Sequence, residues 1–266
     1  MNAHQFPEFL WQKGRELYRD MPWRRDTRPY YILVSELMLQ QTQVARVVPK
    51  FEQFIARFPD EETLANASLA DVLVSWQGLG YNRRARFLWQ AAQMVVREYD
   101  GQFPHDMQGL LRLPGVGNNT AGAIMAYAYN QPSIFIETNV RTVYIHHFFA
   151  DIDTVTDAEI TEKLIATLDH EHPREFYWAL MDYSAHLKSQ GIKTNGRSKH
   201  YKKQSKLEGS VRQVRGRIVT LLTEHGSLTD EELRHLLVAD ERYRPALAGL
   251  VKDEIISVVN DRIAIE

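Results

Sequence analysis

Apolar residues recur at helical spacing through the first 188 residues, and this periodicity is the feature that most limits how the chain can fold. Within successive stretches the apolar side chains lie three or four residues apart, and turn-forming residues separate the stretches. No sustained alternation of apolar and polar residues appears before residue 250. The sequence therefore predicts an all-α fold for this part, with helices at 9–17, 31–41, 47–58, 69–78, 83–99, 107–113, 120–129, 140–149, 157–168 and 175–188.

The C-terminal part of the chain follows a different pattern. Thr229 and Glu232 form a T-x-x-E capping box at the start of one helix, and Asn260-Asp261 marks a turn between two short apolar strands. Three helices closed by such a hairpin predict a winged-helix-like α+β module. The module either contacts DNA or only packs against the rest of the chain, and the fold alone leaves both roles open. Its helices are expected at 211–222, 229–237 and 243–252, and its strands within 255–265.

The composition narrows the class of protein. The chain has 44% hydrophobic and 25% charged residues, as in an ordinary globular protein, and no apolar run approaches the ~20 residues that span a bilayer. Residues 1–20 lack the apolar core of a signal peptide, so we expect a cytoplasmic protein with no membrane partner. The absence of cysteine excludes disulfides, thiol nucleophiles and an all-cysteine iron–sulfur cluster. The histidines lack metal-site spacing, so packing or surface roles are expected for them.

Basic residues concentrate in one stretch, although the net charge is −2. Residues 188–215 are rich in lysine and arginine, with Glu208 as their only acid. A mobile basic stretch that faces a polyanion is one interpretation. A solvated linker that carries lysine for solubility is the other.

The most specific local motif is Leu-Pro-Gly-Val-Gly at residues 113–117, between two expected helices. Gly115 and Gly117 allow backbone conformations that a Cβ forbids. Their amides, with the N-terminus of the next helix, suit a DNA phosphate. A Pro-Gly turn is often only a turn, but small residues follow this one at 120–123. Because they let two helices pack closely across the turn, we expect a helix-hairpin-helix motif.

Four motifs together resemble the adenine DNA glycosylases of the helix-hairpin-helix superfamily, in one order and at family spacing over roughly residues 6–188. The resemblance implies a helix-hairpin-helix glycosylase fold with two helical subdomains around an active-site cleft. We therefore expect a six-helix-type domain with the hairpin at residues 22–132, the second subdomain at residues 1–21 and 133–206, and the winged-helix-like domain at residues 207–266. The motifs are Trp23-Arg24 with Pro29-Tyr30 and SELMLQQTQ at 35–43 (active site), GLGYNRRAR at 78–86 (DNA wedge), the hairpin at 113–117, and ETNVR at 137–141 (second carboxylate).

The resemblance assigns Glu36, Glu137 and Asn139 to catalysis. Breaking a purine N-glycosidic bond needs a proton on the base and stabilisation of a cationic sugar. Glu36 has apolar neighbours along its helix, a setting that raises a carboxyl pKa toward that of a working acid. In the family the matching glutamate protonates adenine N7 and later handles the attacking water. Outside this motif, a helical glutamate is usually a surface salt-bridge residue.

Glu137 departs from the family pattern, which has an aspartate facing the cationic sugar. The extra methylene moves the carboxylate oxygens by ~1 Å, enough to alter the rate of a reaction that depends on exact positioning. Either a shifted backbone lets Glu137 do the same work, or the site has changed substrate or lost activity. The presence of both Glu36 and Asn139 favours a working site.

Further matches concern the reaction type and the DNA. Relatives of the endonuclease III type carry a Schiff-base lysine after the hairpin, where this chain has Asn119, so we expect a monofunctional glycosylase that leaves an abasic site. A flipped base leaves a gap in the duplex, and Tyr81 resembles the tyrosine that fills it. Arg83, Arg84 and Arg86 either meet phosphates or only solvate their helix. The other matches are Gln41, Thr42 and Leu79 around the estranged base, and Arg19 and Arg24 near the extruded adenine.

The family's iron–sulfur cluster has no counterpart here. Lys188 stands at the place of its first cysteine. The resemblance implies that the basic stretch keeps the DNA contacts of the cluster loop without the metal, through Lys199 and Lys202. We expect no cofactor, apart from a monovalent cation at the hairpin. The family's C-terminal Nudix-like domain, which reads 8-oxoguanine, is replaced by the winged-helix-like module.

These features predict a nucleoid-associated monomer that acts on double-stranded DNA with a lesion or mismatch. The leading hypothesis is a base-excision-repair glycosylase that hydrolyses adenine opposite guanine or 8-oxoguanine. A glycosylase for another lesion, such as T in T·G, is one alternative. A non-catalytic DNA-damage-binding protein is the other, supported by Glu137 and the missing reading domain.

Overall fold

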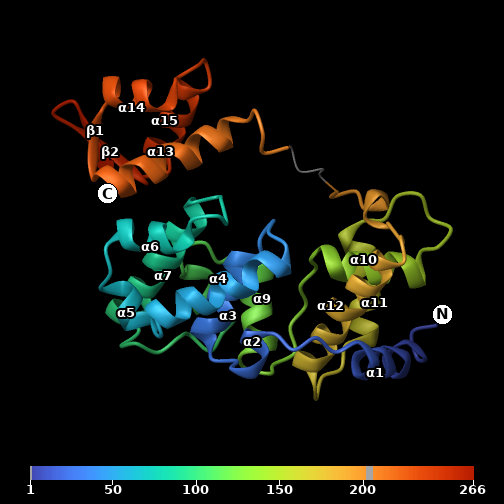
Figure 1. Ribbon diagram of the computed structural model, residues 1–266. Coiled ribbons are helices and arrows are strands. Elements are labelled where there is room, and N and C mark those ends of the chain that lie inside the picture. The colour runs from blue at the N-terminus through green and yellow to red at the C-terminus, as the bar shows by residue number, and fades with distance from the viewer. Residues whose placement is uncertain (1, 202–205) are drawn as a thin grey trace. The chain divides into compact units, whose positions relative to one another are not determined.

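Helices make up most of the computed structural model, which describes residues 2–201 and 206–266 (Figure 1). Every helix expected in the first 188 residues is confirmed near its expected bounds. The short α2, α5 and η1 have no counterpart in the sequence prediction, because one or two turns carry no readable period. Among the described residues, no helix is both long and apolar enough to cross a bilayer. The elements up to residue 201 are α1 (Phe6–Leu17), α2 (Pro22–Arg25), α3 (Pro29–Leu39), α4 (Val44–Arg57), α5 (Glu61–Ala65), α6 (Leu69–Trp76), α7 (Arg83–Glu98), α8 (Met107–Arg112), α9 (Asn118–Tyr127), α10 (Thr138–Phe148), α11 (Asp157–Thr167), α12 (Pro173–Ser189) and the 3-10 helix η1 (Asn195–Arg197).

The chain forms two compact units, each assembled from separate segments. Residues 22–32, 104–112 and 116–132, which the sequence prediction places in the six-helix-type domain, group with unit 1 and the second helical subdomain. The C-terminal module, predicted as a domain of its own, groups with unit 2. Unit 1 comprises Met1–Ile32, Pro104–Arg112 and Val116–Lys203, and unit 2 comprises Leu33–Phe103, Leu113–Gly115 and Gln204–Glu266.

Unit 1 is built around α12, against which α1, α9 and α10 all pack. The approach of α1 is close at Gly14, where a Cβ would lie 2.8 Å from the Cβ of Ala179. A larger side chain there would push the two helices apart. Phe6 at the start of α1 is fully buried, and its ring lies 5.3 Å from that of Tyr144 in α10.

Unit 2 has α7 at its centre, in contact with α5 and α6. Asp60 and Ser68 cap α5 and α6, each accepting a backbone N–H of the first turn that follows it. Trp76 at the end of α6 is fully buried and meets Phe54 of α4 edge to face, with 6.0 Å between ring centroids. These contacts fix the end of α6, from which the wedge turn at residues 78–81 begins.

The C-terminal module has the element order of a winged helix, as expected from the sequence. Its three-stranded antiparallel sheet has the order β1-β3-β2, and the Thr229–Glu232 capping box forms. Strand β1 has no counterpart in the sequence prediction, since three residues are too few to show alternation. Helix α13 packs on α6, and the Gln77 amide donates to the Thr223 hydroxyl at 3.1 Å. The elements are α13 (Val211–His225), β1 (Ser227–Thr229), α14 (Asp230–Leu237), α15 (Tyr243–Lys252), β2 (Ile256–Val259) and β3 (Arg262–Ile265).

Candidate functional site

Glu36 lies in the middle of α3, on an otherwise buried stretch of that helix. Val34 and Leu37 are at most 1% exposed, and between residues 32 and 38 only Glu36 is half-buried rather than buried. The helix is apolar on nearly every side, so it presents one carboxyl group at the edge of a core. This is the kind of setting that suits a general acid.

Arg84 ties the end of this helix to the wedge turn. Its side chain is buried, and its guanidinium donates to backbone carbonyls of both segments. Carbonyls in the last turn of a helix lack helical donors, so Arg84 caps α3 and fixes the turn at once. Burial lowers the pKa of Arg84 to about 10, which leaves it charged at neutral pH. Neither interpretation from the sequence, phosphate contact or helix solvation, is correct for Arg84. The acceptors, at 2.5–3.2 Å, are the carbonyl oxygens of Leu37, Met38, Gln40, Leu79 and Gly80.

Tyr81 is held in a strained turn with its ring partly exposed. Its φ is +50°, a left-handed conformation that side chains with a Cβ rarely adopt. The Trp76 indole donates to the carbonyl of Gly80 at 3.1 Å, which fixes the backbone just before it. The guanidiniums of Arg84 and Arg212 lie 5.4 Å and 4.8 Å from the ring centre, and Arg212 donates a hydrogen bond to the hydroxyl.

Five residues that the sequence assigns to DNA contacts line a single cavity in unit 2. Its volume is about 1370 Å³, more than most small-molecule sites have. The described residues around it include six arginines and one acid, Asp253, so its potential is positive. Arg212 and Gln213 of α13 form part of the wall, and the C-terminal module therefore borders the same space as the wedge turn. The five residues are Gln41, Thr42, Leu79, Tyr81 and Gly115.

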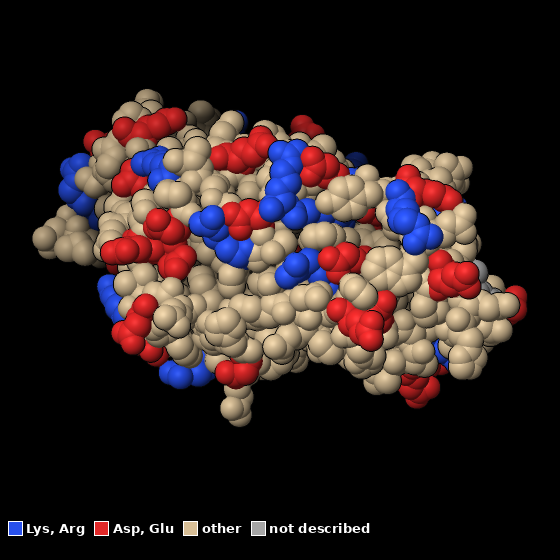
Figure 2. Space-filling model, turned by 90° about the horizontal axis from the view of Figure 1, so that it is seen from below, with Lys and Arg blue, Asp and Glu red and all other residues tan. Residues whose placement is uncertain are grey.

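On the face of the molecule that Figure 2 shows, charges of both signs are mixed. Lysines and arginines are interspersed there with aspartates and glutamates. Neighbouring charges of opposite sign largely cancel at distances beyond the ~8–10 Å screening length of physiological salt. The arginine-rich cavity is therefore the better candidate for contact with a phosphate backbone.

The hairpin at residues 113–117 uses its two glycines differently. Gly115 has a φ of +78°, and a Cβ on it would lie 2.7 Å from the Cβ of Phe87, so both its conformation and its surroundings require glycine. Gly117 has an ordinary extended backbone, and the expectation of a special conformation there is wrong. A Cβ on Gly117 would meet no described atom within 4 Å. The start of α9 is therefore open to a ligand, as an anion site at a helix N-terminus requires.

The segment that leads to Glu137 is fixed against α9. The Asn119 side chain donates to the carbonyl of Ile136 at 2.8 Å and accepts from its N–H at 3.3 Å. At Gly122 a Cβ would lie 2.9 Å from the Cβ of Phe135, so the small residues after the hairpin accommodate this segment. Asn119 thus acts as a clamp on the backbone beside Glu137, and its contact with DNA remains a prediction.

Glu137 is the residue before the first turn of α10, and its backbone is extended. Burial raises the pKa of its carboxyl group, while a hydrogen bond with Asn139 and the charges of Lys188 and Arg141 oppose this rise. The Asn139 Oδ1 also accepts from Lys188 Nζ at 2.7 Å and from the Ser184 hydroxyl at 3.2 Å. Asn139 therefore hydrogen-bonds both the carboxyl group of Glu137 and the ammonium group of Lys188.

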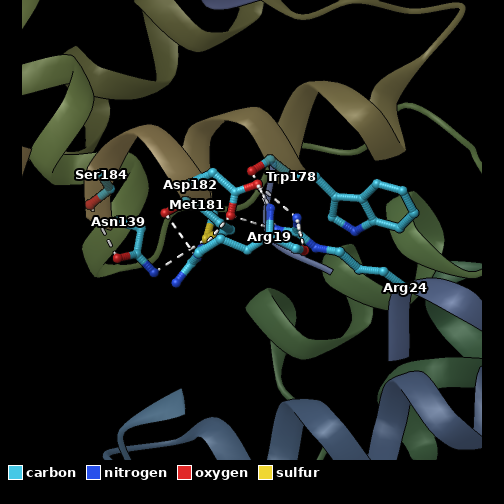
Figure 3. A network of polar contacts seen from close by, with 7 residues as sticks. All are labelled: Arg19, Arg24, Asn139, Trp178, Met181, Asp182 and Ser184. Carbon is cyan, nitrogen blue, oxygen red and sulfur yellow. Dashed lines mark hydrogen bonds and ion pairs between the residues drawn. The ribbon is translucent and has the colours of Figure 1, made fainter. Parts of the chain in front are cut away.

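Arg19 and Arg24 both bind Asp182 of α12 (Figure 3). Arg24 donates to both carboxylate oxygens, at 2.7 and 3.0 Å, and its side chain is only 3% exposed. It is committed to a buried ion pair that joins α2 to α12. Arg19 donates to Asp182 at 2.6 Å but keeps 35% of its side chain exposed, and its contact with an extruded base remains a prediction. Asp182 was not predicted from the sequence. The feature that could have indicated it is an acidic residue on the buried face of a helix.

The basic stretch is docked on unit 1 up to residue 201. The Thr194 hydroxyl donates to the carbonyl of Thr142 at 3.0 Å. Val155 donates to the carbonyl of Arg197 at 2.8 Å and accepts from the N–H of Lys199 at 2.9 Å. Both interpretations from the sequence, mobile arm and solvated linker, are wrong for this portion. The Lys199 side chain is exposed, and its phosphate contact remains a prediction, whereas Lys202 lies outside the described residues.

The described part of the chain has no cluster of side chains that could bind a metal ion. No group of three or more histidines, aspartates or glutamates there is placed to hold a metal ion. Without cysteine, the family's iron–sulfur cluster does not fit this chain. His147 shares a hydrogen bond of 2.9 Å with the Tyr183 hydroxyl among aromatic rings, and burial lowers its pKa to about 4. Its packing role agrees with the expectation for the histidines.

Comparison with known proteins places this architecture in a class of DNA repair proteins. The family model described as "HhH-GPD superfamily base excision DNA repair protein" matches residues 34–168. A solved structure of a thermostable thymine-DNA glycosylase shares the fold, with a TM-score of 0.63 and 23% identity over 75% of this chain and 96% of that one.

Relatives in sequence narrow the class to one family. The adenine DNA glycosylase of Mycobacterium tuberculosis (strain CDC 1551 / Oshkosh) is 34% identical over 93% of this chain and 89% of its own length. The adenine DNA glycosylase of Buchnera aphidicola subsp. Baizongia pistaciae is 35% identical over 63% of this chain. This match covers only about half (48%) of the Buchnera protein's own length. The chain therefore belongs to the HhH-GPD superfamily, in the family of these adenine DNA glycosylases.

Proposed function

We propose that this protein is a monofunctional DNA glycosylase that flips a mispaired adenine, opposite guanine or 8-oxoguanine, out of the duplex and hydrolyses its N-glycosidic bond. The observation that carries the proposal is the cavity of unit 2. Residues from three separate motifs, each assigned to DNA contact from sequence alone, line that one arginine-rich space. The mycobacterial relative, which aligns over 93% of the chain, supports adenine as the substrate.

The reaction uses the two glutamates in different protonation states. Glu36 donates a proton to N7 of the adenine, the bond between C1′ and N9 breaks, and adenine leaves as a neutral base. The carboxylate of Glu137 stabilises the positive charge left on the sugar. Water then adds to C1′ and transfers its proton to the Glu36 carboxylate, which restores the acid. The base and an abasic site are the only products.

Hydrolysis, rather than strand cleavage, follows from the residue after the hairpin. A lyase needs an amine that forms a Schiff base with C1′. Asn119 has an amide, and both ends of that amide are hydrogen-bonded to Ile136. Its role in this reaction is to hold the backbone next to Glu137.

Duplex DNA is held by the wedge turn, the hairpin and the C-terminal module. Tyr81 fills the gap left by the flipped adenine, and the open N-terminus of α9 accepts a phosphate. Arg212 of α13 borders the same cavity as Gln41 and Thr42, so the module contributes to the surface that meets the opposite strand. The protein acts as a monomer, with one lesion in the duplex as its target.

Single-turnover cleavage of a panel of duplexes, followed by alkali, tests the proposal. The panel contains A·8-oxoguanine, A·G, T·G and fully paired controls. We expect base removal from the first two, which alkali converts to broken strands. Removal of thymine alone would show that the substrate is thymine and not adenine. Tight binding without cleavage of any duplex would show that the protein is a damage-binding protein and not an enzyme.

A further inference from the structure

Lys188 reaches the catalytic carboxylate region from the last turn of α12. Its Nζ donates to the Oδ1 of Asn139 at 2.7 Å, and Asn139 hydrogen-bonds Glu137 through the same side chain. The position is the one at which the family resemblance places a cluster cysteine. In this chain it carries a cation, one neutral amide away from the second carboxylate.

The other cations near this group have acids of their own. Arg141 and Arg19 are each in an ion pair, so much of their charge is compensated where they lie. Lys188 has the uncharged Asn139 as its hydrogen-bond partner, and its charge acts on Glu137 without that compensation. The compensated pairs are Arg141 with Asp157, at 2.7 and 2.8 Å, and Arg19 with Asp182, at 2.6 Å.

Tyr177, a further titratable group that interacts with Glu137, is neutral. Tyr177 of α12 is fully buried, its hydroxyl donates to the carbonyl of Ser133 at 2.7 Å, and burial raises its pKa. It therefore adds no positive charge to the site. Of the two cations whose charges oppose the rise in the pKa of Glu137, Lys188 has the larger effect and Arg141 the smaller.

We propose that Lys188 is a positioning residue for base excision: its ammonium group holds the Asn139 side chain by a hydrogen bond of 2.7 Å, and its charge favours the carboxylate form of Glu137. The inference rests on the proposed function, in which an ionised Glu137 stabilises the cationic sugar. It also accounts for a lysine at a position where the chain has no cluster to hold.

The sign of the effect follows from the charges. Burial favours the neutral carboxylic acid and raises the pKa of Glu137, and a nearby cation favours the carboxylate and lowers it. Removing the Lys188 charge therefore raises this pKa. A larger share of Glu137 is then protonated at any pH near the midpoint, and the acid limb of excision moves to higher pH.

The test compares four full-length proteins: the unmodified chain, Lys188→Gln, Lys188→Arg and Lys193→Met. Lys188→Gln keeps a donor for Asn139 but no charge, Lys188→Arg keeps the charge, and Lys193→Met removes one exposed positive charge from the same stretch. The first readout is the titration of the Glu137 carboxyl carbon by ¹³C NMR, assigned with Glu137→Gln. The second is the pH profile of single-turnover adenine excision. Melting temperatures verify folding.

We expect the Glu137 midpoint, and the acid limb of excision, to rise by about one pH unit in Lys188→Gln. Lys188→Arg and Lys193→Met should keep the midpoint of the unmodified protein. An unchanged midpoint in folded Lys188→Gln, or the same shift in Lys193→Met, would overturn the inference. Because the NMR titration needs no activity, a shifted midpoint in a protein that cleaves nothing would support the charge coupling and reject the proposed function instead.

Discussion

The guanidinium of Arg212 lies 4.8 Å from the centre of the Tyr81 ring and donates a hydrogen bond to the Tyr81 hydroxyl. This contact joins the first helix of the C-terminal module to the wedge turn. The module therefore packs directly against the residue that we propose enters DNA. It also lines the cavity beside that residue.

Replacing Tyr81 by alanine should weaken binding to lesion-containing duplex by about 5- to 150-fold, because stacking on a base contributes roughly 1–3 kcal/mol. Tyr81→Phe keeps the ring and should bind within a few fold of the unmodified protein. Fluorescence anisotropy with an A·8-oxoguanine duplex measures both. Melting temperatures should barely change, since the ring is half-buried rather than in a core. Unfolding of Tyr81→Ala would identify the tyrosine as a packing residue.

Arg84→Met should destabilise unit 2 by about 2–4 kcal/mol, since it leaves buried carbonyls at the end of α3 and in the wedge turn without a donor. Arg83→Met is the matched control. The side chain of Arg83 is 59% exposed, and its loss should change stability by at most ~0.5 kcal/mol. Urea unfolding compares the two variants. Equal midpoints would mean that the Arg84 bonds do not hold the turn.

The helices could be predicted from sequence because their signals are local. Apolar periodicity and the Thr229–Glu232 box each act within a few residues. The hairpin was partly predictable: the φ of Gly115 follows from the turn, but the closeness of Phe87 comes from a different helix. Gly117 shows the limit of this reasoning, since its conformation is ordinary and only its open surroundings distinguish it.

Partners distant in sequence could not be predicted in the same way. Arg84 looks like its neighbours Arg83 and Arg86 in an arginine-rich run, and only tertiary structure places it under the wedge turn. Asp182 meets Arg24 from 158 residues away, and Lys188 meets Asn139 from 49. In each case the sequence does not state which face of a helix is covered, so it does not reveal the partner of the charged side chain.

The product of excision should be an intact strand with an abasic site. Borohydride should trap no covalent adduct with the unmodified protein, because Asn119 provides no amine and its amide is hydrogen-bonded to Ile136. Denaturing gels run before and after alkali distinguish the two products. A substantial trapped adduct would show that another amine of the chain attacks C1′.

The two glutamates provide the most direct test of the whole account. The measurement is the single-turnover rate of adenine excision from an A·8-oxoguanine duplex by the unmodified protein, Glu36→Gln and Glu137→Gln, with duplex affinity determined for each. We predict that both variants lose at least ~10²–10⁴-fold in rate while binding within a few fold of the unmodified protein. Excision at an unchanged rate by either variant would contradict the chemistry assigned to that glutamate. No excision by the unmodified protein, despite tight binding, would contradict the proposal that the protein is an enzyme.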